Sequence, residues 1–362
     1  MDLPFFAKLN QPMRGIVGTV MTFIIGALIM VIPLYLWKPW GVNAALAPAG
    51  MGDLDNIVQL GMYMGAGLFA WMYWWTFHMS NWPFQKVPQP LQGLLAGAGS
   101  MVGGFITYYI LHSVLKWDAD IFNMSVLALM WVFILGPWGG MPFAIAYEQK
   151  QPVCGIAGFI ASCGLGLLVW WFLPAEFHGY VPGFPFVWFL MSTVFALTLN
   201  LWPFAQVKQP QQLVLLVGFM AFFSFIYVWV GGAYGLQFFP TVAAHKAGAL
   251  PDLSGSTFTL LWLFVILIPV GLFQFWPFHN APNVARGFAY LIVTLAISIG
   301  LWMWILSAEP AAPVPALAPV VHFRWVFLAL DWTLALFVGW SIVWCNCGVF
   351  MAPPPTGESA HQ

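Results

Sequence analysis

Residues 82–112 read WPFQKVPQPLQGLLAGAGSMVGGFITYYILH. After Lys86 the stretch contains no Asp, Glu, Lys or Arg, and most of it is apolar with closely spaced glycines. A helix that crosses a bilayer needs about 20 such residues. Small residues in membrane helices let the backbones of neighbouring helices approach closely. The stretch therefore predicts a transmembrane helix that follows a turn rich in Trp and Pro.

The rest of the chain has the same character. Hydrophobic residues make up 62% of its 362 residues, and charged residues only 6%. A soluble globular protein carries about 25% charged residues, so this chain has too few charges to cover a surface in water. Its net charge of −1 argues against nucleic-acid binding. We expect an all-α polytopic membrane protein in a bacterial-type inner membrane.

Two short motifs recur along the sequence. Gln-Pro occurs at 11–12, 89–90, 151–152 and 209–210, and the degenerate form Ala281-Pro282 makes a fifth copy. Trp-Pro-Phe occurs at 82–84, 202–204 and 276–278, with a looser version at 137–143. Proline fits the first turn of a helix and stops a helix that precedes it, and Trp suits the bilayer interface. The order of the motifs predicts a repeated unit of helix, loop, helix and stop.

The apolar runs between the motifs predict about ten transmembrane helices in five hairpins. The runs are 14–36, 57–79, 91–113, 123–143, 153–173, 186–204, 212–236, 257–278, 284–306 and 323–345. The hairpins cover about 11–84, 89–143, 151–204, 209–278 and 281–347 of a single domain over 1–350, and 351–362 is a disordered tail. The first run is longer than the core of a cleavable signal, about 7–15 residues, so we expect it to be a mature helix.

This arrangement places the Pro-motif loops and both termini on one side of the membrane. That side carries Lys8, Arg14, Lys86, Lys150, Lys208 and Arg286. The opposite side carries Lys38, Lys116, Lys246 and Arg324. Because Lys and Arg are enriched in cytoplasmic loops, we expect both termini in the cytoplasm.

The two helices of a predicted hairpin differ in amino-acid composition. The first is often rich in small residues, whereas the second is bulkier and more aromatic, as at 71–75. Since small residues suit close packing and large aromatics suit lipid-facing or interfacial positions, we expect the odd-numbered helices to form an inner cluster and the even-numbered helices an outer layer. Two interpretations of the glycines stay open: they only support tight packing, or they surround a narrow pathway.

A layout of five hairpins with cytoplasmic termini resembles that of the tellurite-resistance/dicarboxylate transporter family, whose helical hairpins surround a central pore. The resemblance is one of layout and carries over no functional residue. It implies that a pathway through such a ring is a reasonable expectation for this chain.

Candidate pathway residues follow from position and polarity. Asp331 is the acidic residue that lies well inside a predicted span. A carboxylate there is costly, so it predicts a site for a cation, a proton or a hydrogen-bond donor, with a structural hydrogen bond as the alternative. The other candidates are small or carry hydroxyls: Gly93, Gly97, Ser100, Gly155, Ser162, Thr294 and Ser298. Further hydroxyls lie at Thr107, Ser192, Thr193, Thr198 and Ser224.

Histidines and cysteines raise a second set of possibilities. His78 and His279 flank two Trp-Pro-Phe motifs, and a haem between helices would need such a facing pair. Copper or zinc could bind the outer histidines at 112, 178, 245 and 322. A soft metal could bind Cys345 and Cys347, with Cys154 at similar depth. Isolated interfacial histidines and inert membrane cysteines explain the same residues, so no cofactor is expected.

These observations favour a membrane transporter or channel for a small solute, without catalytic activity of its own. The phosphate loop, the Ser/His/Asp arrangement and the His-Glu-x-x-His motif are all missing from the sequence. Internal repeats are common in transporters, and few charges in the spans favour a neutral molecule, a weak acid or an anion. The alternative is a membrane subunit or anchor of a larger redox or enzyme complex. A homo-oligomer or partner subunits are compatible with either function.

Overall fold

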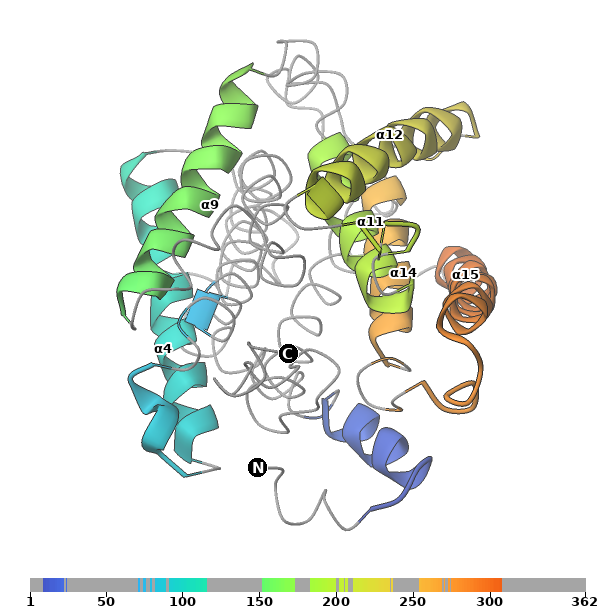
Figure 1. The fold of residues 1–362 in the computed structure, drawn as a ribbon, viewed down its shortest axis with the longest axis horizontal. Coiled ribbons are helices and arrows are strands. Elements are labelled where there is room, and N and C mark those ends of the chain that lie inside the picture. Colours follow the sequence, from blue (N-terminus) through green and yellow to red (C-terminus); the bar gives the residue numbers. More distant parts are fainter. Residues whose placement is uncertain are drawn as a thin grey trace, which may run out of the picture.

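The computed structural model shows a helical protein over the part of the chain that it describes (Figure 1). The described residues are 9–22, 24, 71, 74–75, 79, 82–88, 91–115, 152–172, 183–199, 202–204, 206–207, 211–234, 236, 254–268, 270, 273 and 275–307. Their α-helices are α4 (Leu91–Tyr108), α9 (Val153–Phe172), α11 (Gly183–Leu199), α12 (Gln211–Ala233), α14 (Ser254–Leu267) and α15 (Asn283–Ser307). A 3-10 turn, η4 (Phe84–Lys86), precedes α4, and a π-helical turn, η5 (Tyr109–Val114), extends it.

Helices begin where the proline motif predicts. The helical segment 13–22, α9 and α15 each start at the residue after a proline. In each case the proline carbonyl accepts the N–H of the residue four positions later: Ile16 N–Pro12 O and Ile156 N–Pro152 O at 3.0 Å, Arg286 N–Pro282 O at 2.8 Å. The missing N–H of proline costs nothing there, because the first N–H groups of a helix have no partner inside it.

The three Trp-Pro-Phe motifs adopt the same local structure. The Trp N–H bonds to the carbonyl three residues earlier, at 2.8 Å for Trp82, 3.1 Å for Trp202 and 2.9 Å for Trp276. The Phe carbonyl then accepts the N–H three residues later, at 2.9, 3.0 and 2.9 Å in the same order. The Trp–Pro peptide bond is cis in all three. Each copy is therefore a pair of consecutive turns that ends one helix and leads to the next.

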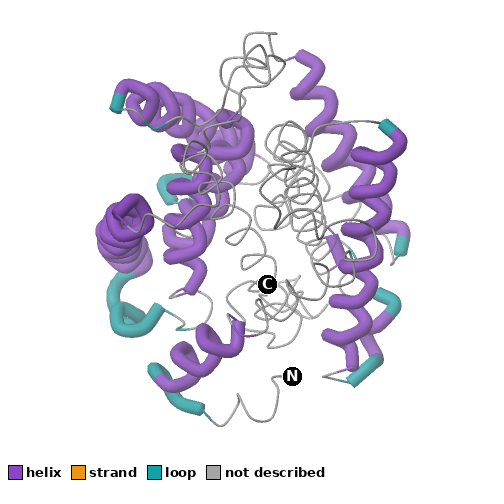
Figure 2. Tube along the Cα trace, turned by 180° about the vertical axis from the view of Figure 1, so that it is seen from behind, coloured by secondary structure: helices purple, strands orange, loops and turns teal. Residues whose placement is uncertain are grey.

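The helices form two groups (Figures 1 and 2). α4 and α9 lie on one side, and α11, α12, α14 and α15 on the other. Within the second group α11 packs against α12, α14 and α15. α12 crosses α11 at a steep angle in Figure 1, with Phe223 against Phe195 and Phe225 against Phe184 on the two sides of the crossing. α14 and α15 share an apolar core of Phe258, Leu261, Val265 and Trp302.

Burial differs from the predicted layers. All residues of α14 are buried, and nearly all described residues of α11. These helices fall in the sixth and eighth predicted runs, so the prediction that even-numbered helices form an outer layer is wrong for both. In contrast, α4, α9, α12 and α15, from odd-numbered runs, bury one face and expose the other. The reason is that small residues occupy only one face of these helices, and large apolar side chains occupy the rest.

Aromatic rings fill the space next to the glycine faces. A Cβ at Gly103 of α4 would lie 2.5 Å from the Trp71 ring, and one at Gly99 would lie 3.1 Å from the Trp75 ring. A Cβ at Gly15 would overlap the Phe273 ring. The aromatics of even-numbered runs were predicted to face lipid; at these positions they instead pack against glycines of odd-numbered runs.

Two helices of the described part are long and apolar enough to cross a membrane. They are Leu91–Leu111, with mean hydropathy 1.5, and Asn283–Ser307, with mean hydropathy 2.1. Only 22% and 28% of their most apolar windows are buried, which differs from the core helix of a soluble protein. Shorter apolar helices occur at Gly155–Val169, Phe186–Phe195, Gly218–Ala233 and Ser254–Leu267. The two long helices point weakly toward membrane association.

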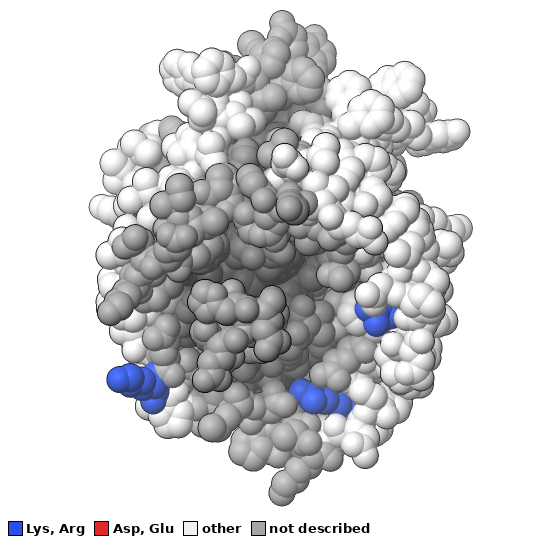
Figure 3. Space-filling view, in the orientation of Figure 1, with Lys and Arg blue, Asp and Glu red and all other residues white. Residues whose placement is uncertain are grey.

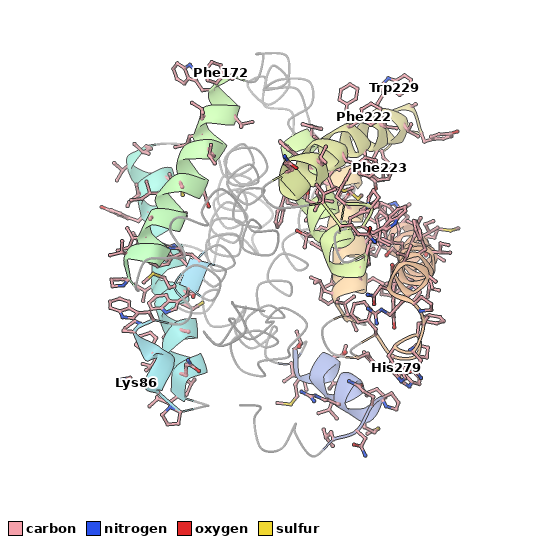
Figure 4. The ribbon with its side chains drawn as sticks, in the orientation of Figure 1. Lys86, Phe172, Phe222, Phe223, Trp229 and His279 are labelled. Carbon is pink, nitrogen blue, oxygen red and sulfur yellow. The ribbon has the colours of Figure 1, made fainter. Side chains whose placement is uncertain are left out.

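The positive charges of the described residues lie in one half of the view in Figure 3. Arg14, Lys86 and Arg286 are the Lys and Arg residues of the described part, and all three lie in the lower half of the view in Figure 3. Lys86 and His279 lie at that end in Figure 4, whereas Phe172 and Trp229 lie at the opposite end. All three cations belong to loops or helix starts of the proline motif.

A matched pair of substitutions in α4 tests the glycine packing. Gly103→Ala should lower the free energy of unfolding by about 1–3 kcal/mol, because the new methyl group overlaps the Trp71 ring. Gly97→Ala should not, because nothing lies within 4 Å of its Cβ position. Thermal unfolding of both purified variants in detergent measures the difference, and equal midpoints would contradict the packing.

Candidate functional site

The candidate site consists of the inward faces of α4, α9 and α15. The buried residues of α4 are Gly93, Ala96, Ser100, Gly103 and Gly104. Those of α9 include Gly155, Gly158, Ser162 and Gly166, and those of α15 are Gly287, Tyr290, Leu291, Thr294, Ser298 and Trp302. Their outward faces carry large apolar side chains such as Ile160, 64% exposed, and Ile292, 67% exposed. Figure 4 shows side chains projecting outward from these helices. Each helix thus turns its small or hydroxyl-bearing face toward the protein.

The hydroxyls of these faces are bonded within their own helices. Ser100 donates to the Ala96 carbonyl and Ser162 to the Gly158 carbonyl, both at 2.8 Å. Ser298 donates to the Thr294 carbonyl at 2.7 Å. A hydroxyl can bond back to the carbonyl one turn earlier in this way without a partner from another helix. Because the hydroxyl hydrogen is used, the oxygen is what remains to accept a bond from a solute or a neighbouring helix.

Two threonine oxygens already accept such a bond from a neighbouring helix. Trp262 of α14 donates its indole N–H to Thr294 Oγ1 of α15 at 3.2 Å. Trp71 donates its indole N–H to Thr107 Oγ1 of α4 at 3.1 Å. Each threonine in turn bonds to the carbonyl four residues earlier, that of Tyr290 or Gly103. In both places, a tryptophan of one apolar run is therefore joined to the next run by two consecutive hydrogen bonds: indole N–H to threonine, and threonine to a backbone carbonyl.

A third tryptophan ties α9 to the same cluster. Trp74 donates its indole N–H to the Gly155 carbonyl at 3.1 Å. The ring of Trp71 stacks on Phe159 of α9 at a centroid distance of 6.1 Å, and Trp74 lies 5.3 Å from Phe159. Gly155 therefore takes part in helix packing, and its carbonyl already accepts a hydrogen bond.

The buried polar side chains of the described residues are all serine or threonine. Three of them have a hydroxyl without a hydrogen-bond partner in the described structure: Ser192 of α11, Ser224 of α12 and Thr257 of α14. Ser224 lies between Phe223 and Phe225, so it sits where α12 crosses α11. An unpaired buried hydroxyl costs about 1–3 kcal/mol. These three are therefore positions where a polar solute or a water would be stabilising.

The predicted site residues are placed in two regions. Gly93, Gly97 and Ser100 lie on α4 and Gly155 and Ser162 on α9, whereas Thr294 and Ser298 lie on α15, on the other side of the molecule (Figures 1 and 2). The structure does not bring the two sets into contact through described residues. Asp331 and His78 lie outside the described residues.

The predicted haem ligand His279 is exposed on the turn that follows Trp276 and Pro277. Its backbone carbonyl accepts a hydrogen bond from Arg286. No group of three His, Cys, Asp or Glu residues that could hold a metal ion occurs within the described part of the chain. Cys163 is a free, half-buried thiol on α9.

The sequence did not predict Thr257, Trp71 or Trp262 as site residues, although Trp71 belongs to the aromatic segment 71–75. The available signal was a tryptophan in the middle of an apolar run with a threonine in the next run, as in Trp71 with Thr107 and Trp262 with Thr294. From composition alone, such tryptophans were predicted to face lipid.

Comparison with known proteins gives no relative. No protein family matches this chain, and no curated protein and no solved structure matches it at a significant level.

A double-mutant cycle tests the Trp–Thr bond. Trp262→Phe and Thr294→Val together should destabilise the protein less than the sum of the single changes, with a coupling energy of about 1 kcal/mol. Chemical or thermal unfolding in detergent supplies the four stabilities. The control cycle pairs Thr294→Val with Trp304→Phe, since Trp304 is 66% exposed on the same helix as Thr294. Equal coupling in the two cycles would show that the bond contributes nothing.

Proposed function

We propose that this chain is a multi-pass membrane protein that lets a small solute cross the bilayer, as a transporter or a channel. In this proposal the spans are about ten helices in five tandem hairpins with both termini in the cytoplasm. The solute is a neutral molecule, a weak acid or an anion.

The observation that carries the proposal is the apolar outward face of the described helices that are exposed on one side, α4, α9, α12 and α15. On α15 the exposed face is made of residues such as Ile292, Ile297 and Met303, and the buried face contains Thr294 and Ser298. A soluble protein places its apolar side chains inside and its polar ones outside. In a bilayer the surroundings are hydrocarbon, so an apolar outer face is stable and the polar groups turn inward. At 25 residues α15 would be about 37 Å long, which exceeds the roughly 30 Å hydrocarbon core.

The nature of the inward groups supports the proposed class of solute. Among the described residues these groups are neutral hydroxyls and glycine backbones, without a buried charge. The paired hydroxyls leave oxygen acceptors for a neutral solute or for the O–H of a protonated weak acid. The unpaired hydroxyls of Ser192, Ser224 and Thr257 could donate to an anion. Transport of a multiply charged cation would call for several carboxylates along the path. In the proposal Asp331 is the single site in the spans that binds a cation or a proton.

Swelling of proteoliposomes tests the proposal across a whole class of solutes. Vesicles with purified protein should swell faster than protein-free vesicles in an isosmotic solution of at least one neutral solute, weak acid or anion of a size series, as followed by light scattering. Ser298→Leu should slow that swelling, because a bulky side chain would intrude on the inward face of α15. Ile297→Leu, on the outward face of the same helix, is the matched control and should leave the rate unchanged. Equal swelling with and without protein over the whole series would contradict transport, and a haem or partner subunit that co-purifies would favour the anchor function.

The proposed role of Asp331 makes a separate prediction. Asp331→Asn should abolish the solute flux while the amount of protein in the membrane and its unfolding temperature stay the same, because the amide cannot carry the charge or exchange the proton. Flux in reconstituted vesicles is the measurement. A variant with wild-type flux would remove Asp331 from the pathway.

A further inference from the structure

Arg286 has an unusual environment at the start of α15. It is half-buried in the first turn of the helix. Its guanidinium carbon lies 4.3 Å from the centre of the Phe275 ring. Nη2 donates to Asn283 Oδ1 at 2.8 Å, and Nη1 donates to the His279 carbonyl at 3.4 Å. The side chain is thus held in one orientation by an aromatic face and two neutral acceptors.

Among the described residues, no opposite charge compensates this guanidinium. Its Nε–H is buried without a hydrogen-bond partner in the described structure. The described residues include no Asp or Glu, and the two acceptors of Arg286 are a carbonyl and an amide. A partly desolvated charge without an opposite charge is costly. Arg286 is therefore suited to an anion that this part of the chain does not supply.

An exposed apolar stripe of α15 leads away from this charge. Val293 and Ile297, which follow Arg286 by seven and eleven residues on the same side of the helix, are 42% and 47% exposed. Trp304, further along this stripe, is 66% exposed. A fixed cation on the Phe275 ring, with a bare apolar helix face leading away from it, matches the two ends of a phospholipid: the phosphate at the cation and the acyl chains along the helix.

We propose that Arg286 binds the phosphate of an anionic phospholipid at the start of α15, with the acyl chains along Val293 and Ile297, through the N–H groups of Nη1 and Nη2 that Asn283 and His279 leave free. The inference rests on the proposed function only in that it places the chain in a bilayer. Arginine suits phosphate because its planar fork can donate two parallel hydrogen bonds.

Native mass spectrometry of the full chain in mild detergent tests the site. Phosphatidylglycerol and phosphatidylcholine with the same acyl chains are titrated separately, and the Kd of the first bound lipid is measured. Phosphatidylglycerol should bind more tightly, and Arg286→Gln should raise its Kd by about tenfold, as expected for the loss of a charged hydrogen bond. Lys86→Gln is the matched control. It removes an exposed cation from the turn that contains Trp82-Pro83-Phe84, and it should change the Kd less than twofold.

Failure of the lipid site and failure of the proposed function give different results. Equal affinity for the two lipids, or equal effects of Arg286→Gln and Lys86→Gln, overturns the proposal. Glycerol phosphate that displaces the lipid at equal concentration also overturns it, because the ligand is then a free phosphate. If Arg286→Gln fails to fold, Arg286→Lys is measured in its place. Lysine keeps the positive charge but lacks the planar guanidinium, so we expect several-fold weaker lipid binding. An unchanged Kd overturns the site. Recovery of the wild-type chain in the aqueous fraction, instead of the membrane, would contradict the proposed function itself.

Discussion

Where Trp71 meets α4, its indole ring occupies the space in which a side chain of residue 103 would lie. The same fit of a bulky group against a glycine occurs between Phe273 and Gly15, and between Leu199 and Gly287, where the Thr198 carbonyl also lies 2.5 Å from the Cβ position. The glycines are therefore needed as surfaces that let another helix approach. In a bilayer, where water does not drive helices together, such close packing is the main source of association. The packing of Trp71 against α4 and of α11 against α15 depends on it.

Hydrogen bonds between the helices also determine how the packed helices are aligned. An unpaired indole N–H group in a hydrocarbon environment costs several kcal/mol. Trp71, Trp74 and Trp262 avoid this cost by donating to Thr107, to the Gly155 carbonyl and to Thr294 on other helices. Each of these bonds fixes the depth of one helix relative to the next. The buried indole N–H of Trp75 has no hydrogen-bond partner in the described structure. The serine and threonine hydroxyls that stay unpaired in the described part, at Ser192, Ser224 and Thr257, lie on three helices that pack on each other.

The sequence predicted the elements better than their arrangement. The run 153–173 corresponds to α9, Val153–Phe172, and the run 284–306 to α15, Asn283–Ser307, because proline and apolar length define a helix locally. Which helix lies inside is decided by contacts between distant residues, and Trp71 against Gly103 cannot be read from either run alone. The assignment of large aromatics to lipid failed at Trp71 and Trp75 for this reason. Of the candidate site, the inward position of Ser100, Ser162, Thr294 and Ser298 followed from composition, whereas the division of these residues between two regions did not. The ten-span topology and the role of Asp331 stay predictions.

The central claim is that the exposed apolar faces lie in lipid and the hydroxyl faces in protein. Spin labels on α15 test it most directly, at position 292 on the exposed face and position 298 on the buried face, in a reconstituted chain whose four native cysteines are replaced. We expect the label at 292 to collide readily with oxygen, which concentrates in the bilayer, and rarely with a water-soluble relaxation agent. The label at 298 should be protected from both. A label at 292 that collides mainly with the water-soluble agent would place this face in water and contradict the claim.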